Sequence, residues 1–261
     1  MIPKKIHYFW IGGNPKPESV LYCIESWKKY CPDFEIIEWN ETNYDFTKNE
    51  YMRQAYEAKK WGFVPDYARL DVIYQNGGLY FDTDVELIKN PNHLLNNKAF
   101  FGFDRASDVT RNNVNCGEGF GAEPFHPILR KMMSAYDSKC FIQSDGVPDL
   151  TPSPYYTTLC LQENGLRNEN VDQKLNNDVM IYASDVLCPK SYCASELHLT
   201  ERTVSIHHFD ATWLDDDLKR KHDRSVRINK AFGDKLGFQI GRIISDAEYL
   251  YTALLRKIKN K

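Results

Sequence analysis

Short apolar segments alternate with helical segments along most of this chain, which is the pattern of an α/β domain. Short apolar runs predict strands, and apolar residues spaced three and four positions apart predict helices. The predicted strands are residues 5–11, 34–39, 79–86, 99–103, 178–183 and 203–206, and the predicted helices are residues 19–30, 49–60, 65–76, 127–136 and 155–164. Because strands separated by helices usually pair in parallel, we expect a mostly parallel central sheet flanked by helices.

The domain organisation follows from length and from the absence of linker composition. A chain of 261 residues can bury one substantial core, and no segment is rich enough in Gly, Ser or Pro to separate two domains. We expect residues 1–215 to form the core and residues 216–261 to form a C-terminal helical extension packed on the same domain. Residues 104–121 are expected to be a mobile loop at the active site.

Residues 64–87 carry the most information, because a short helix with polar groups there precedes an acidic strand. Pro65 suits the first position of a helix, and Asn76 with the two glycines after it predicts the end. The apolar face of this helix consists of Leu70, Ile73 and Tyr74. Asp66 and Arg69 lie one turn apart on it, where they could equally form an ordinary surface ion pair worth about 0.2–0.5 kcal/mol.

The strand that follows predicts a metal site. Apolar and polar residues alternate from Leu79 to Glu86, so Asp82 and Asp84 are expected to face the same way. Carboxylate oxygens are hard ligands that suit Mn²⁺ or Mg²⁺, which proteins commonly hold with one or two carboxylates and substrate phosphates. A bare D-x-D pair is weak evidence, because many solvated loops carry one, but the helix before it strengthens the interpretation.

Charge and composition exclude some classes of protein. A net charge of −3, with no basic stripe that contains aromatic residues, argues against nucleic-acid binding. No run approaches the length of a membrane span, and no apolar leader precedes the first strand, so we expect a cytoplasmic protein. The seven cysteines lack metal-like spacing and are expected to be reduced and mostly buried.

Three segments together resemble a known family. They are residues 2–13 (IPKKIHYFWIGG), residues 64–87 and residues 205–213 (SIHHFDATW). In order and spacing they are similar to the DXD-containing glycosyltransferases of family 32, whose catalytic core is related to the clostridial glucosylating toxins. The resemblance implies a single GT-A type nucleotide-diphospho-sugar transferase domain. It also implies metal-dependent transfer of a hexose, with retention of anomeric configuration.

The resemblance assigns roles to residues that have ordinary alternatives. Trp10 is expected to stack on the donor base, although a tryptophan after a strand can also fill a core. Asp66 and Arg69 are expected to bind hydroxyls of the donor sugar. Tyr80 lies near the donor in the family pattern, yet a strand aromatic can simply pack. The predicted donor-binding residues are Trp10, Ile11, Gly12, Asp66, Arg69, Tyr80, Asp82, Thr83, Asn115 and Trp213.

The metal and the departing diphosphate involve the last of the three segments. The predicted metal ligands are Asp82, Asp84, His207 and His208, and the predicted catalytic residues are Asp66, Arg69, Asp82, Asp84 and Trp213. Successive strand residues point in opposite directions, so only one histidine should face the metal. Ala211 and Thr212 stand before Trp213, where family members often have Gly-Ser. The resemblance therefore does not predict whether this loop closes over the diphosphate.

The expected partners are a nucleotide diphosphate sugar, with UDP favoured over GDP, and a glycan or lipid-linked oligosaccharide acceptor. Such enzymes build capsular or other surface polysaccharides, and the basic C-terminal helix predicts contact with the inner face of the membrane. Two other classes remain open. A haloacid dehalogenase-like phosphohydrolase also uses D-x-D after a strand, though normally after the first strand, and a non-catalytic glycan-binding protein could retain Trp10 and the polar helix.

Overall fold

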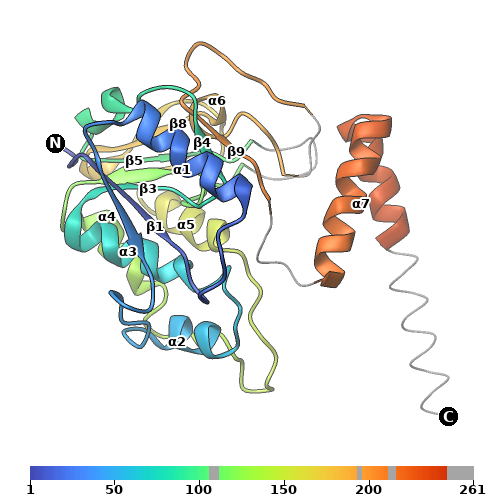
Figure 1. Ribbon diagram of the computed structural model, residues 1–261, viewed down its shortest axis with the longest axis horizontal. Helices are drawn as coiled ribbons and strands as arrows, with labels where there is room; N and C mark the ends of the chain where they lie inside the picture. Colours follow the sequence, from blue (N-terminus) through green and yellow to red (C-terminus); the bar gives the residue numbers. More distant parts are fainter. Residues whose placement is uncertain (106–111, 193–195, 211–215, 246–261) are drawn as a thin grey trace.

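A seven-stranded sheet organises the protein (Figure 1). The computed structural model describes residues 1–105, 112–192, 196–210 and 216–245. The strand order is β2-β1-β3-β6-β5-β8-β7, and β4 pairs with β9 in a separate two-stranded sheet. The strands are β1 (Lys5–Phe9), β2 (Glu35–Trp39), β3 (Gly78–Tyr80), β4 (Val85–Leu87), β5 (Ala99–Gly102), β6 (Phe120–Ala122), β7 (Gln173–Lys174), β8 (Val179–Tyr182) and β9 (Ser205–His207).

Five strands of the large sheet run in one direction. β1 is parallel to β2 and to β3, and β5 is parallel to β8. β6 is antiparallel to both β3 and β5, so β3 and β5 share a direction, while β7 runs against β8. The predicted α/β class, with a mostly parallel central sheet flanked by helices, is therefore confirmed.

Helices cover both faces of the sheet. The described helices are α1 (Glu18–Tyr30), α2 (Glu50–Glu57), α3 (Pro65–Asn76), α4 (Pro127–Ser134), α5 (Ser153–Gln162), α6 (Ser184–Leu187) and α7 (Asp216–Phe232), with 3-10 turns at Asn92–Asn96 and Asn176–Asp178. One buried cluster joins α2 to α5 to one face, and a second joins α1, α6 and β4 to the other. Alternation along β1 sends Phe9 to the first cluster and Ile6 and Tyr8 to the second, as strand geometry requires.

Two predicted elements differ from the structure. The strand predicted over residues 79–86 ends at Tyr80, a turn follows, and β4 begins at Val85 in the other sheet. The prediction of one continuous strand is therefore wrong, and the turn, not strand alternation, places Asp82 and Asp84. The loop predicted over residues 104–121 contains the start of β6, whose glycine approaches β3 too closely for a side chain: a Cβ on Gly121 would lie 2.6 Å from Leu79 Cδ2. Residues 106–111 lie outside the described part.

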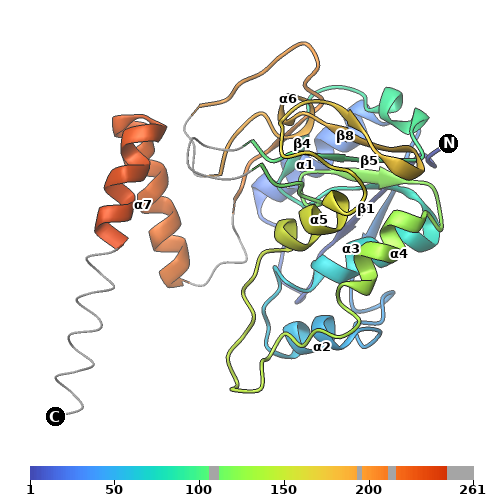
Figure 2. The same cartoon turned by 180° about the vertical axis from the view of Figure 1, so that it is seen from behind.

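The C-terminal helices stand beside the α/β body. Figures 1 and 2 both show α7 to one side of it, and residues 234–245 continue as helix after Gly233. The His222 ring of α7 lies 5.0 Å from the Tyr192 ring, which belongs to the body. Among the described residues, no helix has both the length and the apolar composition that crossing a bilayer requires.

Candidate functional site

The carboxyl ends of the parallel strands meet at one edge of the sheet, and polar residues gather there. Trp10 follows β1, Asp82 follows β3 and Asp104 follows β5, each within two residues of its strand. In open α/β sheets this edge is where ligands bind. A cleft of about 1080 Å³ opens at this edge and is lined by all three of these residues.

Most residues predicted from the sequence line this cleft. They are Trp10, Ile11, Asp66, Arg69, Tyr80, Asp82, Thr83, Asp84, Asn115 and His207. Gly12 does not line it, and its backbone N–H donates to Glu41 Oε1 at 2.7 Å. His208 also lies outside the lining, and Trp213 falls outside the described residues. Residues that were predicted from separate segments of the sequence therefore line one cleft.

Asp66 and Arg69 form a buried ion pair in the first turn of α3. Arg69 Nη2 donates to Asp66 Oδ1 at 2.9 Å, and the two residues are only 4% and 5% exposed. This excludes the exposed surface pair considered from the sequence. Burial raises the pKa of Asp66 to about 6, against the opposing effect of Arg69. The carboxyl offers hydrogen-bond acceptors and the guanidinium offers donors at the cleft wall.

Arg69 also holds the first aspartate of the D-x-D pair. Its Nη1 lies 3.4 Å from Asp82 Oδ2, and its guanidinium lies 5.3 Å from the centre of the Tyr80 ring. The Tyr80 hydroxyl donates to Asp82 Oδ1 at 2.8 Å. Tyr80 therefore packs against Arg69 and also positions a carboxylate at the cleft, and its place near the donor stays a prediction.

A glycine allows Asp82 to sit where it does. The Asp82 backbone N–H donates to the Gly117 carbonyl at 3.0 Å, and Asn115 Oδ1 accepts the Gly117 N–H at 2.8 Å. A Cβ atom on Gly117 would lie 2.3 Å from Asp82 Oδ2 and 3.1 Å from Arg69 Nη1. Any side chain at this position would displace the carboxylate, so the close approach requires glycine.

Asp84 pairs with His207 across the two-stranded sheet. His207 Nε2 lies 3.2 Å from Asp84 Oδ1, and the Asp210 backbone N–H donates to Asp84 Oδ2 at 3.0 Å. Burial is the largest influence on the pKa of Asp84 and raises it, but the charge and hydrogen bond of His207 together with the backbone N–H donors lower this pKa overall. The same contact raises the pKa of His207 although burial opposes this. Both groups are held in the charged form by each other.

His208 points to a different partner. Its Nε2 lies 3.0 Å from Glu86 Oε2, and Tyr22 donates to the other oxygen of Glu86 at 2.7 Å. Glu86 therefore contacts His208 and Tyr22 and does not belong to the group of Asp82, Asp84 and His207. Of the two histidines, His207 is the one that lies beside the aspartates.

Asp82, Asp84 and His207 can hold a divalent cation. One ligand atom from each lies within 4.8 Å of the others. The two carboxylate oxygens suit Mn²⁺ or Mg²⁺, and His207 could add an imidazole nitrogen only after it gives up its proton. The donor set fits the predicted cation.

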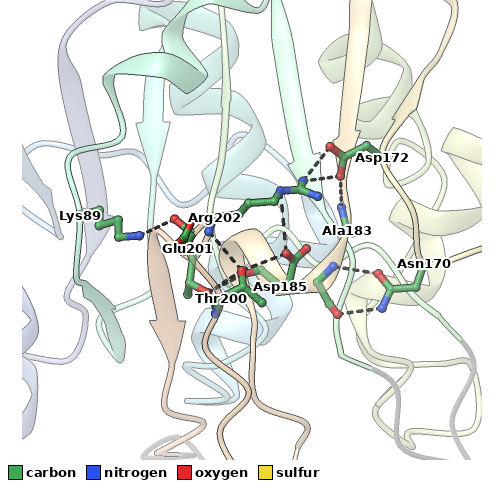
Figure 3. Close-up of polar contacts among 10 residues, drawn as sticks. Lys89, Asn170, Asp172, Ala183, Asp185, Thr200, Glu201 and Arg202 are labelled. Atoms are coloured by element: carbon green, nitrogen blue, oxygen red, sulfur yellow. Dashed lines mark hydrogen bonds and ion pairs between the residues drawn. The ribbon is translucent and has the colours of Figure 1, made fainter.

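A polar network anchors the segment that leads into β9 (Figure 3). Arg202 Nη2 donates to both carboxylate oxygens of Asp172 at 2.7 Å, and its Nε lies 3.8 Å from Asp185 Oδ2. The Thr200 hydroxyl donates to the same Asp185 oxygen at 3.1 Å. Because these contacts join the β7 to α6 region to the start of β9, they fix the strand that carries His207.

Several cleft residues escaped the sequence prediction. Among them are Trp61, Asp104, Arg105, Phe209 and Asn229. Asp104 follows a parallel strand, so the rule that ligands bind at the carboxyl edge could have found it. Trp61 and Asn229 come from segments far from the sheet edge in sequence, and no local pattern marks them.

The fold and cleft define an α/β protein with an acidic, cation-competent site at the carboxyl edge of its sheet. Residues 17–101 match the family described as the glycosyltransferase sugar-binding region containing the DXD motif. The resemblance drawn from the sequence is thereby confirmed. The matched region includes α3, Asp82 and Asp84, which form the part of the cleft just described.

Curated relatives point to the same family. The chain is 30% identical over 135 residues to an uncharacterized glycosyltransferase, L373, of Acanthamoeba polyphaga mimivirus, covering 49% of this chain and 53% of that protein. It is 26% identical over 140 residues to inositol phosphoceramide mannosyltransferase 3 of Schizosaccharomyces pombe, covering 51% of this chain and 36% of that protein. The chain thus spans about half, or less, of the length of these relatives.

Among solved structures, the chain is similar to a glycosyltransferase involved in glycosylation of the major capsid of PBCV-1. The identity is 12%, the TM-score is 0.43, and the match covers 79% of this chain and 94% of that one. A likeness to the PaToxG glycosyltransferase has a TM-score of 0.44 at 20% identity and covers 62% of this chain and 69% of that one. Neither likeness bears on donor or acceptor.

Proposed function

We propose that this protein is a metal-dependent glycosyltransferase that moves a hexose from a nucleotide diphosphate sugar to a hydroxyl group. The acceptor is a glycan or a lipid-linked oligosaccharide, and the process is surface polysaccharide synthesis. The single observation that carries the proposal is the meeting of the buried Asp66 and Arg69 pair with Asp82, Asp84 and His207 in one cleft. The sugar and the diphosphate of a donor are joined to each other, so the residues that bind the sugar must lie beside the residues that bind the diphosphate.

The donor would lie along the carboxyl edge of the sheet. Trp10 is half-buried, and its indole N–H donates to the Asn14 carbonyl at 2.7 Å, which fixes one edge of the ring while the ring lines the cleft. A fixed aromatic plane suits stacking on a nucleotide base. The sugar would then reach Asp66 and Arg69, whose carboxyl and guanidinium groups match hydroxyl acceptors and donors.

Asp82 and Asp84, with His207 beside them, would hold Mn²⁺ or Mg²⁺, which neutralises charge on a departing diphosphate when bound. Arg69 orients Asp82 through its own contact at 3.4 Å and stays charged because its neighbours are carboxylates. Asn115 holds the adjacent loop through Asp104, to which its amide donates at 3.1 Å. These residues position the leaving group.

Transfer with retention is supported by how the cleft carboxylates are used. Asp66 and Asp82 share Arg69, Asp84 pairs with His207, and Asp104 accepts from Asn115. Each of these four carboxylates is engaged in holding a neighbour, so attack on the same face as the leaving phosphate fits better than a covalent intermediate on one of them. The acceptor hydroxyl would approach that face.

Of the rivals, the haloacid dehalogenase-like reading is weaker, because its nucleophilic aspartate normally follows the first strand whereas Asp82 follows β3. A binding protein would not need the buried Asp84 and His207 pair. UDP-sugars remain our first choice of donor. Two relatives are named inositol phosphoceramide mannosyltransferases, which makes a mannosyl donor and a lipid-linked acceptor the second candidate.

We also propose that the C-terminal helices complete the cleft and face the membrane. Asn229, Phe238 and Arg242 line the cleft opposite the sheet edge. Phe232, Leu236 and Ile243 are 57%, 50% and 69% exposed, so an apolar surface accompanies them. The basic residues that first suggested membrane contact, Arg256, Lys257, Lys259 and Lys261, lie outside the described residues. A cytoplasmic place at the inner membrane face follows from this proposal.

The test is release of nucleotide from a panel of UDP- and GDP-sugars, with and without Mn²⁺. The wild-type protein should act on one donor only with the metal, and Asp84→Ala should lose at least about a hundredfold in rate. Asp137→Ala, an exposed aspartate paired with Arg130, is the matched control and should behave as the wild type. Metal-independent turnover, or equal rates in Asp84→Ala, would reject the proposal.

A further inference from the structure

A second group of ligand-type side chains lies directly behind the donor cleft. Glu118, Cys188 and His207 each place one ligand atom within 4.8 Å of the other two, and all three residues are buried. They come from three separate elements: the turn before β6, the end of α6 and the last residue of β9. No local sequence pattern brings them together, and the proposed donor chemistry uses only His207.

Two of these residues have polar atoms without partners. Glu118 is 0% exposed, and neither of its carboxylate oxygens has a hydrogen-bond partner among the described residues. His207 is 6% exposed, and its Nδ1 likewise has no partner in the described part of the chain. Buried polar atoms are nearly always satisfied, so three orphaned atoms in one pocket of side chains indicate a missing ligand.

The residues around Glu118 do not supply that ligand. Asp104 and Cys188 contact Glu118, but burial has the largest effect and raises the pKa of Glu118 well above its usual range. The Cys188 thiol donates instead to the Lys190 carbonyl at 3.3 Å and stands 4.0 Å from Asp104 Oδ1. A carboxyl, a thiol and an imidazole thus form one buried group, in which neither Glu118 oxygen has a hydrogen-bond partner of ordinary distance and angle among the described residues.

We propose that Glu118, Cys188 and His207 form a second cation site, distinct from the Asp82 and Asp84 pair, that takes a thiophilic divalent ion of the Zn²⁺ class. Thiolate, imidazole and carboxylate are the ligands of zinc sites, whereas Mn²⁺ and Mg²⁺ prefer oxygen. Ligands 2.0–2.3 Å from a tetrahedral ion stand about 3.3–3.8 Å apart, so closing this group requires a movement of about an ångström. The thiol would exchange its bond to Lys190 for the ion and release its proton.

The second site changes what His207 can do. Asp84 lies 3.2 Å from Nε2, which leaves Nδ1 for the inner ion. With the ion on Nδ1, the neutral ring keeps its proton on Nε2 and donates it to Asp84, an arrangement in which a carboxylate orients a metal-bound histidine. The donor-site cation would then rely on Asp82 and Asp84, and the inner ion would fix β9 to the turn before β6.

The test uses Co²⁺ as a spectroscopic substitute for Zn²⁺ in the metal-stripped full-length chain. We expect one equivalent of Co²⁺ to produce a thiolate-to-cobalt charge-transfer band in the near ultraviolet, and Zn²⁺ to abolish it by displacement. Cys188→Ser should lose the band. Cys140→Ser, which changes an exposed free cysteine, should keep it. No band at saturating Co²⁺, or a band that persists in Cys188→Ser, would overturn the proposal.

Two further variants keep the test decisive if Cys188→Ser fails to fold. Glu118→Gln preserves shape and should weaken Co²⁺ binding at this band by more than about tenfold, the lower bound for losing even an outer partner of a metal. Asp82→Ala should keep the band, because Asp82 contacts Arg69 and Tyr80 and not a ligand of the inner ion. If Glu118→Gln binds Co²⁺ as tightly as the wild type, the proposed site is contradicted, even when Cys188→Ser does not fold.

Discussion

At the scale of single residues, the site depends on close contacts that only certain side chains permit. Gly117 is the clearest case, because a Cβ there would stand 2.3 Å from Asp82 Oδ2. Arg69 is a second, since it contacts Asp66, Asp82 and the Tyr80 ring at once. A lysine has one charged nitrogen and could not make all three contacts.

Gly117→Ala should lower metal-dependent donor turnover by at least about tenfold, because the added methyl group displaces the Asp82 carboxylate and small misplacements at a reacting centre are costly. Nucleotide release from the preferred donor measures it. Gly146→Ala is the control: its φ of 80° makes alanine strained there, but nothing lies within 4 Å of the new Cβ. That variant should lose stability alone. Equal turnover in Gly117→Ala and the wild type would show that Asp82 is not held as described.

Whether the sequence could predict a site residue depends on whether its importance comes from local spacing or from a long-range contact. Asp66, Arg69, Asp82 and Asp84 lie within one short stretch, so local spacing was enough to select them. Gly117 could not be selected, because its importance is a contact with Asp82 across the sheet. The same holds for the unsatisfied carboxylate of Glu118, since burial is a tertiary property.

At the scale of elements, the predicted strands and helices largely exist, and their errors have one cause. The strand around Asp82 was extended too far because alternation continues through Glu86, whereas β4 pairs with β9 more than a hundred residues later. Long-range pairing, which local pattern cannot show, decides where the strand ends. β6 was missed for a similar reason: its three residues include a glycine and are recognisable only from their place between β3 and β5.

His7 links three elements and gives the core a pH dependence. It lies on β1, its Nδ1 accepts from the Trp39 indole of β2 at 3.0 Å, and its Nε2 lies 3.0 Å from the Gly77 carbonyl at the end of α3. With Nδ1 accepting, Nε2 carries the proton and donates to Gly77. Burial lowers the pKa of His7 to about 4.

This predicts that stability falls as pH drops from about 6.5 to about 4. In that window the unfolded chain binds a proton at His7 and the folded chain does not. The free energy of unfolding is therefore highest above the pKa of His7 in the unfolded chain and falls as the pH approaches the pKa of His7 in the folded chain. Urea unfolding at several pH values should show a smaller decline for His7→Gln than for the wild type. A decline of equal size in both would assign the pH dependence to other groups.

At the scale of the whole molecule, the cleft is built from two parts, the sheet edge and the C-terminal helices. The exposed apolar residues Phe232, Leu236 and Ile243 lie on those helices. If this surface meets a membrane, replacing all three by serine should reduce binding of the full-length protein to anionic vesicles by at least about tenfold, since each buried apolar side chain contributes about 1.5 kcal/mol or more. Vesicle flotation measures the bound fraction.

The matched control replaces Leu21, Leu159 and Leu199 by serine. These leucines are 49%, 42% and 52% exposed and lie on other parts of the surface, so vesicle binding should persist. Equal binding by both triple variants would place the contact elsewhere, and absence of binding by the wild type would remove the membrane from the proposal while leaving the donor site untouched.

The central claim is that Asp82 and Asp84, with His207 beside them, hold the cation through which a nucleotide diphosphate is bound. Titration calorimetry of UDP and GDP, with Mn²⁺ or with a chelator, tests it directly. We predict that one nucleotide binds at least about tenfold more tightly with Mn²⁺, and that Asp84→Asn removes this gain. Asp185→Asn, in the network that anchors β9, should retain most of it. If neither Mn²⁺ nor the Asp84→Asn substitution changes the affinity for UDP or GDP, the claim is contradicted.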